Sequence, residues 1–143
     1  MDKNTKIKVE KSTQLLAAVM VFLLFALVGC SHTRSTYRSL SAEEFAECIA
    51  TEGIEVVDVR TPMEYARGHL AGAININVKE NNFCEECARR LEKRRGVGVY
   101  CQRGKRSKMA AELLNDMGYD VVELDSGIEV WQEKLEYGQD IQK

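Results

Sequence analysis

The stretch Tyr100-Cys101-Gln102-Arg103-Gly104-Lys105-Arg106-Ser107 joins a short apolar run to a helical segment, and the fold can be predicted outward from it. The run Val97–Tyr100 predicts a strand, and residues 105–117 predict a helix that Gly118 ends. In open α/β sheets the ligand lies beyond the carboxyl ends of the strands, which is where Cys101 falls. The stretch therefore predicts a cysteine at the functional edge of an α/β sheet.

The segments on either side of this stretch alternate between predicted helices and predicted strands. Ser41 and Glu44 have the spacing of a capping box, which begins a helix that runs to about Ala50. The β-branched run Ile54–Val59 predicts a buried strand, and Pro62 marks the first turn of a short helix. Further strands are predicted at residues 73–78 and 121–124, and further helices at residues 83–93 and 127–135. The alternation predicts an α/β fold with a central, mainly parallel sheet flanked by helices.

The composition is that of one globular domain, with 143 residues, 45% of them hydrophobic, and a net charge of -2. The part of the chain that follows the lysine-bearing amino terminus is mildly acidic. A protein of that charge has no broad basic field, so nucleic acid is not an expected partner and an anion must bind at a local group of cations. The charge therefore favours a small anion as the ligand.

The amino terminus has the order of a secretory signal, with lysines followed by the apolar run Leu15–Val28. Leu27-Val28-Gly29-Cys30 resembles a bacterial lipobox, which predicts lipidation of Cys30. Acyl chains on Cys30 would anchor the protein to a membrane of the cell envelope, facing the periplasm or the exterior. The alternative is an uncleaved membrane anchor, although the run is shorter than the about 20 apolar residues that a spanning helix needs.

These features give the expected boundaries along the chain. Residues 1–30 are the expected lipoprotein signal peptide, which ends at the lipobox cysteine, and residues 31–39 are a polar tether. Residues 40–138 form the expected domain, and residues 139–143 a C-terminal tail.

The surroundings of Cys101 favour a negative charge on its sulfur. A thiolate rather than a thiol attacks sulfur, so a catalytic cysteine needs such surroundings. Gly104 lets the backbone curl, and the helix that follows points unpaired N–H groups toward the loop. Three cations add positive charge: Arg103, Lys105 and Arg106. The alternative, a buried small hydrophobe at a strand end, explains neither the glycine nor the cations.

Three blocks of sequence closely resemble the single-domain rhodaneses. They are Val57-Asp58-Val59-Arg60-Thr61-Pro62-Met63-Glu64-Tyr65, Gly68-His69-Leu70-Ala71-Gly72-Ala73-Ile74-Asn75, and the stretch from Tyr100 to Ser107. The resemblance covers about residues 40–138, and the blocks occur in the order and spacing of the family. It implies a rhodanese-like α/β fold and a sulfurtransferase that needs no metal and no organic cofactor.

The resemblance also implies roles for the residues of the loop. Cys101 is the nucleophile, which accepts a sulfane sulfur from thiosulfate, a persulfide or a polysulfide and passes it to a thiol or cyanide. The main chain of the next six residues is the anion-binding cradle: Gln102, Arg103, Gly104, Lys105, Arg106 and Ser107. Arg106 stands where the family often has a residue that helps to define substrate charge.

Residues of the first two blocks receive structural roles: Asp58, Arg60, Glu64 and His69. Asp58 near Arg60 is expected to be a hydrogen-bonded pair rather than a general base, and His69 a structural histidine rather than a proton shuttle. Ser126 departs from the family, which commonly has glycine there. Serine fits this position if the backbone does not need a positive φ.

Two functions of other classes are alternatives. A phosphatase or arsenate reductase of the same fold has five residues between cysteine and arginine, whereas four separate Cys101 from Arg106, which gives a cradle too narrow for phosphate. A non-turnover persulfide carrier or redox-binding module in the cell envelope would use the same cysteine. Multiple turnover with a small acceptor distinguishes an enzyme from a carrier.

Cys84-Glu85-Glu86-Cys87 forms a C-x-x-C motif with three interpretations. In an oxidising compartment Cys84 and Cys87 are a candidate redox pair, with a thiol redox protein as partner. Plain packing is the second, because Cys87 has core spacing with Phe83 and Leu91 on one helix face. A metal site is the least expected, since zinc would need further ligands and the sequence has only 2 histidines.

Overall fold

The computed structural model describes residues 36–134 and 141–142. The expected signal peptide, the lipobox with Cys30 and the first part of the expected tether lie outside the described residues. Within the described part of the chain, no helix is both long enough and apolar enough to cross a membrane.

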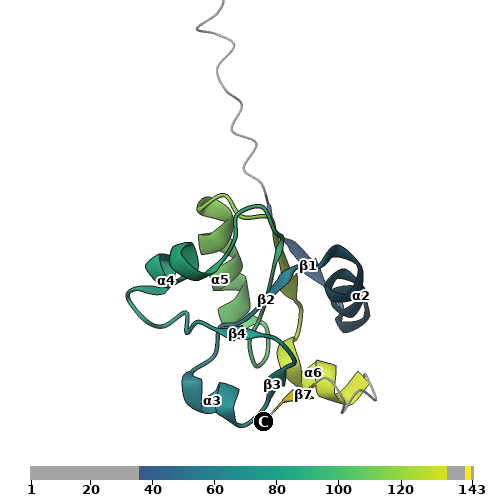
Figure 1. The fold of residues 1–143 in the computed structure, drawn as a ribbon. Helices are drawn as coiled ribbons and strands as arrows, with labels where there is room; N and C mark the ends of the chain where they lie inside the picture. Colours follow the sequence, from purple (N-terminus) through teal and green to yellow (C-terminus); the bar gives the residue numbers. More distant parts are fainter. Residues whose placement is uncertain (1–35, 135–140, 143) are drawn as a thin grey trace, which may run out of the picture. The chain divides into compact units, whose positions relative to one another are not determined.

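The centre of the domain is a parallel sheet with the strand order β1-β6-β5-β2-β4 (Figure 1). In chain order the strands are β1 (Arg38–Leu40), β2 (Glu55–Asp58), β4 (Ile74–Asn75), β5 (Val97–Tyr100) and β6 (Val121–Leu124). Strand β5 lies between β2 and β6, where Val99 pairs with Val57 on one side and with Glu123 on the other. The strand that ends just before Cys101 is therefore in the middle of the sheet.

Helices cover both faces of this sheet (Figure 1). The helices of the described part of the chain are α2 (Ala42–Glu52), α3 (Pro62–Ala66), α4 (Phe83–Arg90), α5 (Lys105–Asp116) and α6 (Gly127–Lys134), and α2, α4, α5 and α6 pack on the faces of the sheet. Helices α4 and α5 pack on one face, over a core that includes Val57 and Val99. Helices α2 and α6 pack on the other, where the rings of Phe45 and Trp131 meet edge to face at 6.1 Å. The predicted α/β fold with a mainly parallel sheet is confirmed.

The predicted capping box at the start of α2 is confirmed. The Glu44 N–H donates to the Ser41 hydroxyl at 3.2 Å, and the Ser41 N–H donates to the Glu44 carboxylate at 2.9 Å. Helix α3 begins in the same way, with Thr61 and Glu64 exchanging the equivalent bonds at 3.3 and 3.0 Å. These side chains satisfy N–H groups that have no partner inside the helix, so both helices begin at fixed positions.

Short strands account for the differences from the sequence prediction. Strand β1 begins at Arg38, inside the expected tether, and the strand expected at residues 73–78 is only the two residues of β4. A second sheet pairs β3 (His69–Leu70) antiparallel with β7 (Ile141–Gln142), which was expected to be part of the tail. Two or three residues carry too little alternation to predict a strand, and their pairing partners are distant in sequence.

Gly98 lets helix α2 pack closely on the middle strand. A Cβ at this position would lie 2.8 Å from Ile54 Cδ1 and 2.9 Å from Phe45 Cζ. Both neighbouring side chains are buried, so neither can move away without disturbing the core.

Gly98→Ala should therefore destabilise the domain. Overpacking a core of this kind costs about 1–3 kcal/mol, which urea unfolding followed by circular dichroism would measure. Ala46→Gly, on the partly exposed side of α2, is a control that costs only about 1 kcal/mol of helix propensity. An unchanged stability of Gly98→Ala would contradict the close packing of α2 on β5.

Candidate functional site

The loop after β5 is shaped by two glycines from different parts of the chain. Gly104 precedes helix α5 with φ +85, in the left-handed region that favours glycine. Gly127 begins α6 with φ +70, and a Cβ there would lie 2.5 Å from the carbonyl carbon of Gln102. The N–H groups of Ile128 and Glu129 then donate to the carbonyls of Cys101 and Gln102 at 2.9 and 3.3 Å. The start of α6 thus holds the loop in place from behind.

Cys101 lines a cavity of about 680 Å³ at the carboxyl end of β5. The cysteine is only 1% exposed, so a reactant approaches its sulfur through this cavity. The rest of the lining comes from α3, from the loops after β4 and β5, and from α5: Glu64, Lys79, Gln102, Arg103, Lys105, Arg106 and Met109. The structure brings together the predicted nucleophile and four of the six predicted cradle residues.

The predicted main-chain cradle has the geometry to bind an anion. Within the described residues, none of the N–H groups of residues 102–107 donates to another protein group. They surround the turn that carries Cys101 and open the first turn of a twelve-residue helix, whose dipole favours negative charge at this end. The two cradle residues that do not line the cavity, Gly104 and Ser107, are buried beneath it.

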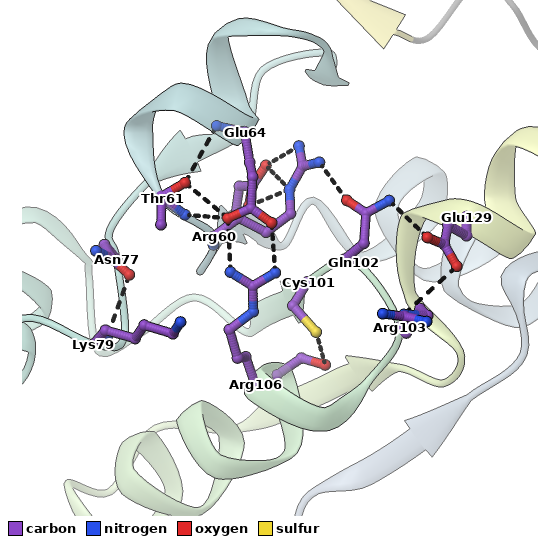
Figure 2. Close-up of polar contacts among 12 residues, drawn as sticks. Arg60, Thr61, Glu64, Asn77, Lys79, Cys101, Gln102, Arg103, Arg106 and Glu129 are labelled. Atoms are coloured by element: carbon purple, nitrogen blue, oxygen red, sulfur yellow. Dashed lines mark hydrogen bonds and ion pairs between the residues drawn. The ribbon is translucent and has the colours of Figure 1, made fainter.

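Arg106 does not act as the free cation that the sequence suggested. Its guanidinium donates two hydrogen bonds of 2.7 Å to the two carboxylate oxygens of Glu64 (Figure 2). These bonds hold the pKa of the Glu64 carboxyl well below its usual range, despite partial burial, and raise the pKa of Arg106. Glu64 was expected to be purely structural, yet it lines the cavity and balances the charge of Arg106.

The free positive charge at the cavity comes from two lysines. Lys105 was predicted, whereas Lys79 was missed. Neither forms an ion pair with any described residue, and Figure 2 shows Lys79 pointing toward the Cys101 loop. Arg103 lies 3.9 Å from the Glu129 carboxylate, with a side chain that is 78% exposed, so this contact fixes it weakly. Lys79 follows β4 at the same edge of the sheet as Cys101, which is the signal that could have identified it.

Asp58 and Arg60 form the buried pair that the sequence predicted. Two nitrogens of Arg60 bind the Asp58 carboxylate at 2.7–3.0 Å, and both residues are almost fully buried. Arg60 also donates to the Gln102 side chain at 3.0 Å, and Gln102 donates to Glu129 at 3.1 Å (Figure 2). The pair therefore orients the Gln102 side chain next to Cys101, and the Asp58 carboxylate is bound by Arg60 as predicted.

His69 has the structural role that was predicted. Its ring stacks on Tyr65 with 3.6 Å between centroids, and Nδ1 lies 3.0 Å from the Tyr65 carbonyl oxygen. The residue is 9% exposed and is not among those that line the Cys101 cavity.

Ser126 does need a positive φ, so the condition for an easy replacement of glycine is not met. Its φ is +66, and its amide nitrogen would lie 3.2 Å from a Cβ on Gly104. A non-glycine residue in the left-handed region destabilises the folded protein by about 1–2 kcal/mol, and Ser126 imposes this cost next to the Cys101 loop. The fold assignment is unaffected.

The thiols of the C-x-x-C motif lie in different surroundings. Cys87 packs in the core with Phe83 and Leu91, as the packing interpretation predicted, and Cys84 is exposed. The two sulfurs are not bonded to each other. Burial, together with the nearby Cys84, raises the pKa of the Cys87 thiol to about 12. The redox pair stays a prediction, and it is separate from the Cys101 cavity.

Comparisons with known proteins agree with this geometry. A family model described as a rhodanese-like domain matches residues 41–134. The chain belongs to the rhodanese-like family. It is 42% identical over 73 residues to the thiosulfate sulfurtransferase PspE of Escherichia coli, an alignment that covers 50% of this chain and 68% of that protein. It is 32% identical over 99 residues to the thiosulfate sulfurtransferase GlpE of Pseudomonas entomophila, covering 68% of this chain and 87% of that one.

A solved structure shows the same rhodanese-like fold. The crystal structure of a rhodanese-related protein from Thermoplasma volcanium superposes with a TM-score of 0.63 at 34% sequence identity. The match covers 74% of this chain and 98% of that one. The predicted family is therefore confirmed by sequence and by structure.

Glu64→Gln should reveal the ion pair through its pH dependence. The pKa of Glu64 is lower in the folded protein than in the unfolded chain. The ion pair with Arg106 therefore stabilises the fold at any pH above the ordinary carboxyl pKa. This stabilisation is lost as the pH falls from that value through the pKa of Glu64 in the folded protein. We expect the variant to lose about 1–2 kcal/mol near pH 7 and progressively less below about pH 4, measured by urea unfolding.

Glu85→Gln is the matched control, because Glu85 is exposed and has no ion pair with a described residue. A Glu64→Gln deficit that stayed constant from neutral to acidic pH would contradict the ion pair as its cause.

Proposed function

We propose that this rhodanese-like protein is a sulfurtransferase that carries a sulfane sulfur on Cys101. The observation that carries the proposal is the position of Cys101, next to unpaired main-chain N–H groups and in a cavity that two free lysines also line. Such surroundings favour a thiolate and an anionic donor. The relatives named thiosulfate sulfurtransferases support the same chemistry.

The reaction has two steps at one sulfur. The Cys101 thiolate attacks the outer sulfur of the donor, the donor's sulfur–sulfur bond breaks, and the remainder, sulfite when the donor is thiosulfate, leaves with the bonding electron pair. A thiolate acceptor or cyanide then attacks the outer sulfur of the Cys101 persulfide and restores the Cys101 thiolate. The cradle N–H groups stabilise the negative sulfur in each state. A metal ion or an organic cofactor has no role in either step.

The charge distribution favours a sulfur anion over phosphate. A phosphatase would use the arginine of the loop to hold the phosphoryl oxygens, whereas Arg106 is held by both carboxylate oxygens of Glu64. The volume of about 680 Å³ lies within the range of small-molecule sites, so an organic persulfide is as suitable a donor as thiosulfate.

Replacing the nucleophile tests the proposal. Cys101→Ser should reduce sulfur transfer from thiosulfate to cyanide to the rate without protein, whereas Cys84→Ser, an exposed cysteine outside the cavity, should keep the full rate. Mass spectrometry after incubation with thiosulfate, a polysulfide or glutathione persulfide should show one added sulfur on Cys101. Full transfer by Cys101→Ser would refute the assignment, and a single stoichiometric transfer by the wild type would indicate a carrier.

We also propose that the protein is held in the bacterial cell envelope by lipid on Cys30. The support is the order of lysines, apolar run and lipobox-like residues that ends at Cys30. Several acyl chains, each contributing about 0.8 kcal/mol per buried methylene, would hold the domain at the membrane surface. The sulfur chemistry would then take place outside the cytosol.

Cys30→Ala should move the protein from the membrane fraction to the soluble fraction, while Cys84→Ser should leave it in the membranes. Palmitate labelling and fractionation of bacterial cells measure both effects. A mature protein that retains Met1 would exclude cleavage at the lipobox.

A further inference from the structure

A buried carboxylic acid lies directly behind the nucleophile. Glu123 is on β6, in the register next to Val99, and it is 0% exposed. Within the described part of the chain, the hydrogen-bond partners of its two oxygens are hydroxyl groups only: Oε1 lies 2.6 Å from Ser107 Oγ, and Oε2 accepts a hydrogen bond from Ser39. Among the described residues it has no ion pair. Burying a charged carboxylate without a cation beside it is costly.

Ser107 connects this acid to the reactive sulfur. Its Oγ lies 3.5 Å from Cys101 Sγ, 2.6 Å from Glu123 Oε1 and 2.9 Å from the Gly104 carbonyl oxygen. A hydroxyl has one proton to donate and can accept from other groups. The Ser107 proton can therefore point to only one of these three neighbours. When it points to the sulfur or to the Gly104 carbonyl oxygen, the 2.6 Å contact between Ser107 Oγ and Glu123 Oε1 is a hydrogen bond only if the Glu123 carboxyl group donates the proton.

We propose that Glu123 takes up the Cys101 proton through the Ser107 hydroxyl and thereby keeps the sulfur in the attacking thiolate form. The Cys101 S–H bond breaks, its proton binds Ser107 Oγ, and the original Ser107 proton moves to Glu123 Oε1. The sulfur keeps the electron pair, so the net charge of the buried site is unchanged. The negative charge moves from a carboxylate that has hydroxyl partners only to a sulfur beside the main-chain cradle.

Glu123 does not touch the sulfur, so it is a positioning residue for the nucleophile. Other charged and titratable groups act on the same site from neighbouring elements. Tyr37 and Lys108 interact electrostatically with Glu123, and Arg106 with Cys101. Lys108 is bound to Asp125 at 2.8 Å and Arg106 to Glu64, so neither neutralises Glu123. The inference rests on Cys101 being the nucleophile of the proposed function.

The test is the rate of alkylation of Cys101 by iodoacetamide as a function of pH, read by mass spectrometry at that residue. Glu123→Gln keeps the shape of the side chain but cannot take up a proton, so the rate profile should move to higher pH. Alkylation near pH 7 should slow about tenfold for every pH unit by which the profile moves. Glu123→Met, an apolar residue of similar size, should give the same change if the Gln variant does not fold. Cys84, in the same samples, is the internal reference.

Three further variants separate proton uptake from packing. Ser39→Ala removes the contact to the other oxygen of the same carboxyl group and should not slow alkylation, because the path from the sulfur to Glu123 remains intact. Ser107→Ala should slow alkylation as Glu123→Gln does, and Ser107→Thr, which keeps a hydroxyl, should restore it.

An unchanged or faster alkylation of Cys101 in Glu123→Gln would overturn the proposal. Such a result would mean that Glu123 in the wild type stays ionised and only repels the thiolate, so that its removal does not slow the reaction. Equal slowing by Ser39→Ala would overturn it as well. Alkylation of Cys101 does not require sulfur transfer, so a failure of this inference can be told apart from a failure of the proposed function. A protein that transfers no sulfur but shows the Glu123 dependence would disprove the proposed function while still showing that Glu123 takes up the Cys101 proton.

Discussion

The contact between the start of α6 and the Cys101 loop is the constraint on which the site depends. Gly127 passes so close to the loop that no side chain fits between them, and the next two N–H groups bind the carbonyls of Cys101 and Gln102. With these carbonyls bound by α6, the N–H groups of the turn are the unpaired donors of the loop among the described residues. The shape of the loop depends on this close approach.

The charged groups at the cavity and behind it are of two kinds, those that pair with one another and those that are free. Arg106 and Glu64 neutralise each other and tie α3 to the start of α5, and Asp58 with Arg60 fixes Gln102. These pairs give the site rigidity, because each is held by several hydrogen bonds of 3.0 Å or less. The attraction of an anion is left to the lysines and to the main chain. A mildly acidic protein can thus select an anion locally.

Much of the site could be predicted from one local segment. Cys101, Gly104 and the helix that follows are adjacent in sequence, so strand, turn and helix dipole could be inferred together. Met109 could not, because neither its residue type nor its spacing marks it, and Lys79 could have been identified only from its position after β4 at the same edge of the sheet. The pairing of Arg106 with Glu64 could not be predicted either, because Glu64 is 42 residues away and the charge of a side chain does not show where its counterion lies.

The fold class and the family could be inferred from the sequence alone, and Cys101 could be predicted as the nucleophile, since periodicity, caps and the three blocks are local patterns. Which charges are free could be seen only in the folded domain, because pairing depends on contacts such as Glu64 with Arg106. The tertiary structure alone placed Glu123, an ordinary acidic residue in a β-strand sequence, behind Ser107 and Cys101. The physical reason is that burial and hydrogen bonding arise where strands and helices distant in sequence meet.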